Sequence, residues 1–184
     1  MSLPSADTPS PIRTVFPVRP ASLRDAKSIA EIHVSAWQEA ARLAGPPEAR
    51  PADSVERRQA AWREAIDLCE PQVLVATERD KVIGFVAFDR SRDKGTPSTT
   101  GEVWALYVAP SHWGRGVGLA LWDAARDGLQ EEGCIRTTMW LPMRFERAMR
   151  FVSLAGFKRE TGSAQTVEVG GIRIEEIRVQ RGLV

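Results

Sequence analysis

The fold is decided by Val103-Trp104-Ala105-Leu106-Tyr107-Val108, which is followed after four residues by Trp113-Gly114-Arg115-Gly116-Val117-Gly118-Leu119. The first run is apolar and β-rich, and a helix-like pattern follows the glycines. Glycines at such a turn remove side chains, so successive backbone N–H groups can close on an anion that the helix N-terminus also attracts. The segment therefore predicts a strand–turn–helix unit that holds a phosphate or pyrophosphate.

The glycine spacing excludes two better-known phosphate-binding motifs. A dinucleotide fingerprint, G-x-G-x-x-G, that began at Gly114 would need its third glycine where Leu119 stands. A P-loop would end in G-K-[ST], and neither Lys nor Ser or Thr stands there. Three glycines in five residues also fit an ordinary tight turn, so the flanking sequence has to decide.

Length and composition fit one globular domain with a sizeable core, at 184 residues, 43% hydrophobic and 27% charged. A net charge of +1 offers no general attraction for nucleic acid or an anionic membrane. Since no apolar run approaches the roughly 20 residues of a membrane span, we expect a cytoplasmic protein. Cys69 and Cys134 lie far apart in apolar patterns, which predicts two buried free thiols. His33 and His112 are isolated, so no metal site is expected.

The pattern along the chain predicts a flexible tail over residues 1–13 and one α/β domain over 14–184. The predicted order is β-α-α-β-β-β-α-β-α-β-β, which implies a mixed sheet with helices on its faces. The predicted strands span about 14–19, 73–77, 82–88, 102–108 and 134–141, with at least two more after 157; the helices begin near 22, 53, 116 and 143. A long polar loop is expected over 89–101.

Leu106-Tyr107-Val108-Ala109-Pro110 and the glycine turn together resemble the acetyl-coenzyme A motif of the GNAT N-acetyltransferase superfamily, L-Y-V-x-P followed by [QR]-x-x-G-x-[GA]. Gly116 and Gly118 occupy the two glycine positions, whereas Trp113 replaces the usual Gln or Arg. Val18-Arg19-Pro20-Ala21 resembles the start of the family's first strand and helix. Residues 145–157 resemble its late helix, N-x-R-A-x-x-F-Y-x-x-x-G-F. The resemblance covers about residues 15–179.

The resemblance implies a single-domain GNAT-like fold, with a mixed, mostly antiparallel central sheet flanked by helices on both faces. It implies acetyl transfer from acetyl-coenzyme A to an amine of a small molecule or peptide by direct attack, without a metal. Family members often form homodimers. The implied cofactor-binding residues are Leu106, Tyr107 and Val108 for the pantetheine arm, Trp113, Gly114, Arg115, Gly116, Val117, Gly118 and Leu119 for the pyrophosphate, and Arg147 for the adenosine end. A backbone N–H of Val108 or Tyr107 would face the thioester oxygen.

Attack requires an uncharged amine, so the reaction calls for a general base. Glu102 begins the cofactor strand, where some family members place their base; the alternative is a structural carboxylate paired with an arginine. Glu39, Glu70 and Asp89 are weaker candidates.

The family's usual general acid is missing from this chain. Val152 stands at the position of the late helix's Tyr, and Phe145 at that of its Asn. Ser153 and Tyr107 are the candidate substitutes. The loss of both polar residues also allows a second interpretation, a catalytically degenerate module that binds acyl-coenzyme A as a sensor or regulatory domain. A third is a nucleotide-binding α/β protein.

Overall fold

The computed structural model describes residues 16–44, 54–169 and 172–184. The predicted tail, the start of the predicted first strand, and residues 45–53 and 170–171 lie outside this part of the chain. None of the helices in the described ranges combines the length and the apolar character needed to cross a membrane.

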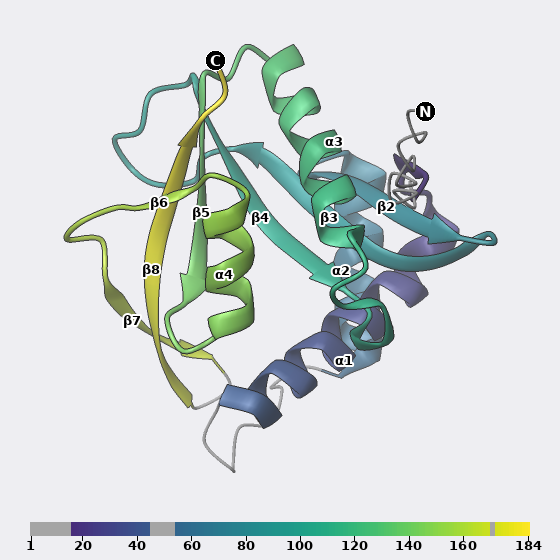
Figure 1. Cartoon of the computed structure of the whole chain (residues 1–184). Coiled ribbons are helices and arrows are strands. Elements are labelled where there is room, and N and C mark those ends of the chain that lie inside the picture. The colour runs from purple at the N-terminus through teal and green to yellow at the C-terminus, as the bar shows by residue number, and fades with distance from the viewer. Residues whose placement is uncertain (1–15, 45–53, 170–171) are drawn as a thin grey trace, which may run out of the picture.

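Eight strands form one sheet in the order β1-β2-β3-β4-β5-β8-β6, and β7 pairs with β8 (Figure 1). Only the β4–β5 pair is parallel, which confirms the predicted mixed, mostly antiparallel sheet. The strands are β1 Val18–Pro20, β2 Gln72–Glu78, β3 Lys81–Arg90, β4 Thr100–Val108, β5 Arg136–Pro142, β6 Lys158–Arg159, β7 Gln165–Val169 and β8 Ile172–Gly182.

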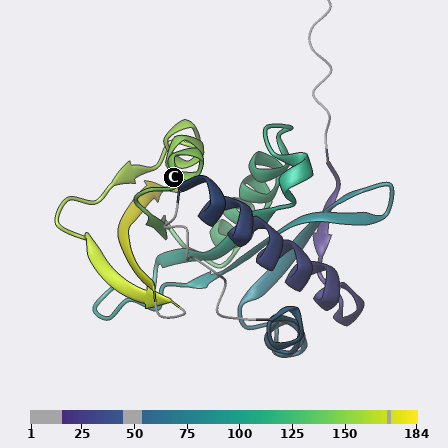
Figure 2. The same ribbon diagram turned by 90° about the horizontal axis from the view of Figure 1, so that it is seen from below.

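Helices cover both faces of the sheet, as Figures 1 and 2 show. One face carries α1 and α2, and the other carries α3 and α4. The helices are α1 Ala26–Ala44, preceded by the short 3-10 helix η1 Leu23–Asp25, α2 Val55–Leu68, α3 Val117–Glu131 and α4 Glu146–Leu154. A second 3-10 turn, η2 Pro110–His112, follows β4.

Local signals in the sequence fix several of these boundaries. Ser22 and Asp25 form a capping box at the start of the first helical segment. The Ser54 hydroxyl accepts a hydrogen bond from the backbone N–H of Arg57 and so caps α2. Gly133, with φ +80°, ends α3, because the left-handed conformation costs glycine little.

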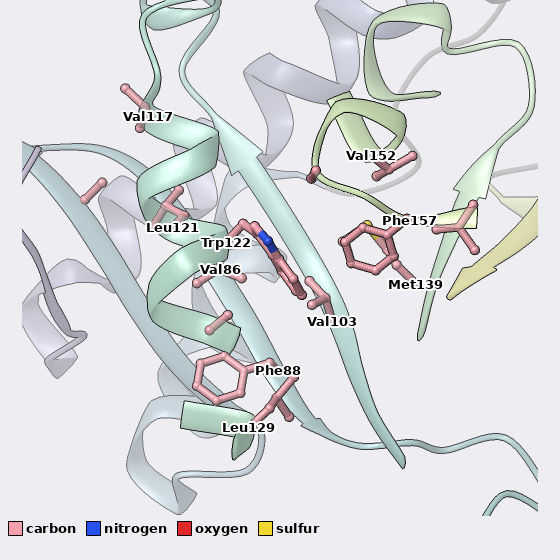
Figure 3. Packing of buried hydrophobic residues seen from close by; sticks show 14 of the residues in the cluster. Val86, Phe88, Val103, Val117, Leu121, Trp122, Leu129, Met139, Val152 and Phe157 are labelled. Carbon is pink, nitrogen blue, oxygen red and sulfur yellow. The ribbon is translucent and has the colours of Figure 1, made fainter. Parts of the chain in front are cut away.

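Two hydrophobic clusters fill the space between the sheet and its helices. The cluster under α3 and α4 contains Trp122, Val152 and Phe157, which Figure 3 shows together. The cluster under α1 and α2 contains Ile29 and Phe85. These two layers account for the helices on both faces, since each apolar sheet face has to be covered.

Three sequence predictions differ from the structure. The polar loop is shorter than 89–101, because β3 extends to Arg90 and β4 begins at Thr100. The late helix begins at Glu146 rather than at 143. Cys69 is exposed, so its predicted burial is wrong: α2 ends at Leu68, and Cys69 turns away in a left-handed conformation with φ +52°. Cys134 is buried as expected.

The sheet splits between β4 and β5. These strands pair only over Thr100–Glu102 and 136–138, whereas β5 stays paired with β8 along its whole length. Just beyond the last pair, Ala87 of β3 lies opposite Ala105 and the next residue lies opposite Val103, so Trp104 is an extra residue in β4. Because a β-bulge increases local twist, it turns β4 away from β5 and leaves the V-shaped divergence seen in Figure 1.

Candidate active site

The split leaves unpaired backbone groups along the far half of β4. The backbone N–H of Ala109 donates to the oxygen of Ile83 on β3 at 2.9 Å. Since backbone groups alternate in direction along a strand, the N–H groups of Val108 and Leu106 point away from β3, toward the gap between β4 and β5. This edge can pair with an extended amide-containing chain and can present one N–H to a developing oxyanion. Of the two predicted oxyanion donors, Val108 has the required direction.

The glycine turn follows directly from this edge. Gly114 and Gly116 have φ +76° and +91°, which explains why glycine stands at both positions. Gly116 is the N-cap of α3, and its oxygen accepts the helix's first hydrogen bond, from the N–H of Ala120 at 3.1 Å. The N–H groups of Val117, Gly118 and Leu119 therefore lie free of partners within the helix and converge beyond its N-terminus. Such a cradle suits a pyrophosphate.

Trp113 fixes the turn from both sides. Its indole Nε1 donates to the backbone oxygen of Val108 at 2.8 Å, and the guanidinium carbon of Arg147 on α4 lies 5.0 Å from its ring centroid. This distance is within cation–π range. The structure thus places Arg147 beside Trp113, at the start of the glycine turn. Residue spacing alone did not reveal either contact.

Arg115 points to the β2–β3 hairpin instead of lying over the cradle. One of its guanidinium nitrogens lies 2.7 Å from Oε1 of Glu78, and Nε2 of His112 lies 3.1 Å from Oε2 of the same carboxylate. The hydrogen bond from His112, followed by that from Arg115, lowers the pKa of Glu78. Arg115 and His112 therefore hold the glycine turn against the β2–β3 hairpin.

Glu102 lies at the vertex of the split and is only 2% exposed. Its Oε2 accepts the backbone N–H of Arg92 at 2.9 Å, and its Oε1 lies 2.5 Å from the Arg92 guanidinium. That guanidinium also lies 4.0 Å from the centroid of the Trp104 ring. Both carboxylate oxygens are thus engaged in holding the loop between β3 and β4. This geometry favours the structural alternative for Glu102, and its role as general base stays a prediction.

The weaker candidate bases lie elsewhere in the fold. Glu39, on α1, forms an ion pair with Arg42 at 2.6 Å. Glu70 is exposed and follows α2. Asp89, on β3, accepts a hydrogen bond from the backbone N–H of Arg90 at 2.7 Å. None of these three residues belongs to β4 or β5, the strands that form the split.

Tyr107 faces α1 within an aromatic cluster. Its ring stacks on His33 at a centroid distance of 4.4 Å, and Nδ1 of His33 accepts the indole N–H of Trp62 at 3.1 Å. His33 is buried. Burial raises the pKa of the Tyr107 phenol, which therefore keeps its proton at neutral pH.

The late helix presents no polar group at the positions of the family's Tyr and Asn. Val152 is buried among core side chains, close to Phe157 in Figure 3. Phe145 packs edge-to-face with Trp37 at 5.7 Å between centroids. Ser153 is exposed on α4, the neighbour of a core residue, so it points away from the core. Of the two predicted substitutes for the acid, only Tyr107 lies beside the split.

Sequence reasoning missed a polar network on the face of the sheet that carries α1 and α2. Arg178 of β8 forms ion pairs with Asp93 at 2.7 Å and Glu160 at 2.5 Å, and its guanidinium lies 5.7 Å from the Trp140 ring centroid. These contacts, that with Glu160 first, raise the pKa of Arg178. Glu176 and Arg178 of β8 alternate with apolar residues, as is typical of a strand with one polar face. This alternation could have indicated the polar network from the sequence.

The described residues include no group of three or more His, Cys, Asp or Glu side chains arranged to hold a metal ion.

Comparison with known proteins agrees with this geometry. The uncharacterized N-acetyltransferase YuaI of Bacillus subtilis strain 168 is 24% identical over 162 residues, which cover 87% of this chain and 89% of YuaI. Mycothiol acetyltransferase of Stackebrandtia nassauensis is 32% identical over 105 residues, 56% of this chain but only 34% of that protein. The profile of the acetyltransferase (GNAT) family matches residues 27–157. The chain therefore belongs to the acetyltransferase (GNAT) family, which confirms the resemblance.

Solved structures show the same fold. YncA of Salmonella typhimurium, solved with its cofactor acetyl-CoA, superposes with a TM-score of 0.71 at 23% identity, covering 93% of this chain and 95% of YncA. A phosphinothricin acetyltransferase of Sinorhizobium meliloti, also in complex with acetyl-CoA, superposes with a TM-score of 0.69 at 20% identity, covering 92% and 89%. The GNAT fold is thus shown over nearly the whole chain.

Proposed function

We propose that this protein transfers the acetyl group of acetyl-coenzyme A to the amine of a small molecule or peptide. The observation that carries the proposal is the continuity of two features. The unpaired edge of β4 ends at Val108. The cradle formed by the amides of Val117, Gly118 and Leu119 follows it after η2 and the glycine turn. A single donor with an extended amide arm and a pyrophosphate would engage both features.

Several of the predicted cofactor residues have a definite task in this proposal, whereas the Arg115 side chain points away from the cradle. Leu106 and Val108 present backbone groups to the pantetheine arm, and the N–H of Val108 stabilises the thioester oxygen as it gains charge. The amides of Val117, Gly118 and Leu119 hold the pyrophosphate. Arg147, stacked on Trp113, adds a positive charge at its outer side.

Tyr107 is the best-placed proton donor for the departing thiolate. Its phenol keeps its proton at neutral pH, because burial raises its pKa, and its strand forms one side of the split. A thiolate is a tolerable leaving group even without a strong acid, since thiols ionise near pH ~8.5. The apolar Val152 and Phe145 are therefore compatible with turnover.

The test combines binding with thiol release. Calorimetry should detect acetyl-coenzyme A binding in the micromolar to millimolar range that is typical of enzyme substrates, without competition from ATP or NAD. Turnover is then measured by the release of free thiol with a panel of amino acids, polyamines and peptides. The assay needs Cys69→Ser protein, because the exposed Cys69 would react with the thiol reagent. Binding without amine-dependent thiol release would favour the acyl-coenzyme A-binding module and contradict the proposal.

The cytoplasmic location and the homodimer stay predictions. Light scattering coupled to gel filtration would measure the oligomeric state.

A further inference from the structure

Glu176 lies on the polar face of β8, at the open end of the split. In the sheet register it lies opposite Pro142, the last residue of β5, and opposite Gln165 of β7. The next residue, Ile177, is buried, and Val179 belongs to the core cluster under α3 and α4. Because successive side chains of a strand point to opposite faces, Glu176 points toward the face that carries α1 and α2.

Tyr107 reaches the same end of the split from the opposite strand. The last parallel pair joins Glu102 to Thr138, and from there Tyr107 lies five residues along β4, whereas Pro142 lies four residues along β5. Tyr107 packs with the apolar cluster under α1 and α2, so it shares its face with Glu176. The two side chains therefore flank the opening at one level, and the thioester position beside Val108 lies between their strands.

Electrostatics agree with this placement. Burial is the main cause that raises the pKa of the Tyr107 phenol; Arg58 of α2 opposes this shift, and the charge of Glu176 adds to it. Burial raises the pKa of the Glu176 carboxyl, and a hydrogen bond with Gln165 only partly opposes this shift. The nearest cation on the same face of β8, Arg178, is already paired with Asp93 and Glu160.

We infer that Glu176 is the catalytic base that takes the proton from the acceptor amine, at the mouth of the split opposite Tyr107. The inference rests on the proposed function and deepens it. It assigns to a residue of β8 the role of general base that the sequence predicts for Glu102. Both carboxylate oxygens of Glu102 are bonded to Arg92. A carboxylate at this mouth also favours a cationic acceptor, a primary ammonium, over an anionic one.

The proton balance of the step is simple. The Glu176 carboxylate accepts one proton from the ammonium and later releases it to water. The neutral nitrogen forms the new C–N bond with the acetyl carbon as the C–S bond breaks. Tyr107 donates its proton to the departing thiolate, which leaves as the free thiol, and the second N–H proton of the amine restores the phenol. The products are an acetamide, coenzyme A thiol and one proton in solution.

The first experiment needs no known acceptor. Carboxyl-carbon NMR of protein labelled in its glutamates gives the titration of each side chain, and the resonance that disappears in Glu176→Gln belongs to Glu176. We expect it to titrate above the ordinary value of 4.5. Glu175→Gln is the matched control, because this neighbour is exposed and carries the same charge. Titration of Glu176 at or below the ordinary value would overturn the inference.

The second experiment uses thiol release with any amine of the panel that the wild-type protein acetylates. Glu176→Gln should lower kcat/KM by ~10²–10⁴-fold and abolish the acidic limb of its pH profile, with acetyl-coenzyme A affinity unchanged in calorimetry. Glu175→Gln should keep both the rate and the limb. A hydrazide acceptor, already neutral at pH 7, should lose less rate in Glu176→Gln than an alkylamine does.

The outcomes separate the two proposals. Failure of the wild-type protein to bind acetyl-coenzyme A would contradict the proposed function. Normal binding and turnover with an unchanged acidic limb in Glu176→Gln would overturn only the assignment of Glu176.

Discussion

The indole Nε1 of Trp113 donates a hydrogen bond to the backbone oxygen of Val108 at 2.8 Å. The bond joins the end of the strand that would face the thioester to the turn that would hold the pyrophosphate. The family's usual residue at position 113 is Gln or Arg, and here the indole donates to the Val108 oxygen, which β5 does not reach. In the proposed function, Trp113 is therefore a positioning residue for both halves of the donor site.

Trp113→Phe should lower the free energy of unfolding by about 1 kcal/mol, because it leaves the Val108 oxygen without its donor while keeping an aromatic ring under Arg147. It should also weaken acetyl-coenzyme A binding. Urea unfolding and calorimetry measure the two effects. Trp104→Phe is the control, since the buried Nε1 of Trp104 has no partner among the described residues. Equal loss of donor affinity in both variants would contradict the role of the Trp113 hydrogen bond.

Gly116→Val should weaken acetyl-coenzyme A binding at least tenfold, which corresponds to about 1.4 kcal/mol. Its side chain would project beside the amide cradle from a backbone with φ +91°. Gly133→Val provides a control for strain, because Gly133 has φ +80° at the other end of α3 and nothing within 4 Å of an added Cβ. Calorimetry measures the acetyl-coenzyme A affinity of both variants. Equal affinities would contradict a role of the amide cradle in donor binding.

Glu102→Gln should act mainly on stability, since Glu102 holds Arg92 at the vertex of the split. We expect a loss of about 1–2 kcal/mol, moderated because the Arg92 side chain is 55% exposed. Arg92→Gln should cause a similar loss, and the double variant little more, because the pair acts as a unit. A 10²-fold or greater fall in kcat/KM for Glu102→Gln at unchanged stability would instead restore Glu102 as the base.

Asp25 should make stability depend on pH in the acid range. The hydrogen bond from Arg19, ahead of the opposing effect of burial, lowers the pKa of Asp25 from 3.8 to about 2. A lowered folded-state pKa stabilises the protein above the ordinary value, and this stabilisation disappears as the pH falls toward about 2. Asp25→Asn should therefore cost about 2 kcal/mol at neutral pH and much less at pH 2, as measured by urea unfolding. Asp123→Asn, which removes a half-buried surface pair with Arg126, is the control for the loss of an aspartate charge and should cost about 0–1 kcal/mol at neutral pH.

The two thiols should differ in reactivity toward Ellman's reagent. Cys69 is exposed and should react at once in the native protein. Cys134 is buried, and burial raises the pKa of its thiol, so it should react only on unfolding. One rapid equivalent under native conditions and two in guanidinium are expected. Two rapid equivalents in the native protein would contradict the burial of Cys134.

Much of the donor site could be predicted from the sequence, because its chemistry is local. The turn at Gly114 and Gly116 needs residues that tolerate positive φ, and the helix that follows supplies its own free amides. The capping box at Ser22 and Asp25 and the hairpin at Arg79 and Asp80 are equally local. In each case the residues that form the feature lie within a few positions of one another, so the feature can be recognised from the sequence alone.

The tertiary structure alone decided which carboxylates face the reaction. Glu102 and Glu176 are both strand glutamates, and nothing in their neighbours along the chain distinguishes an engaged carboxylate from one at the mouth of the split. Arg92 closes off the first through a loop contact, whereas pairing with β5 and β7 brings the second opposite Tyr107. These relations join residues about 10 to 70 positions apart. Sheet register and the bulge at Trp104 therefore determine them, because side-chain periodicity fixes only the face on which a residue lies.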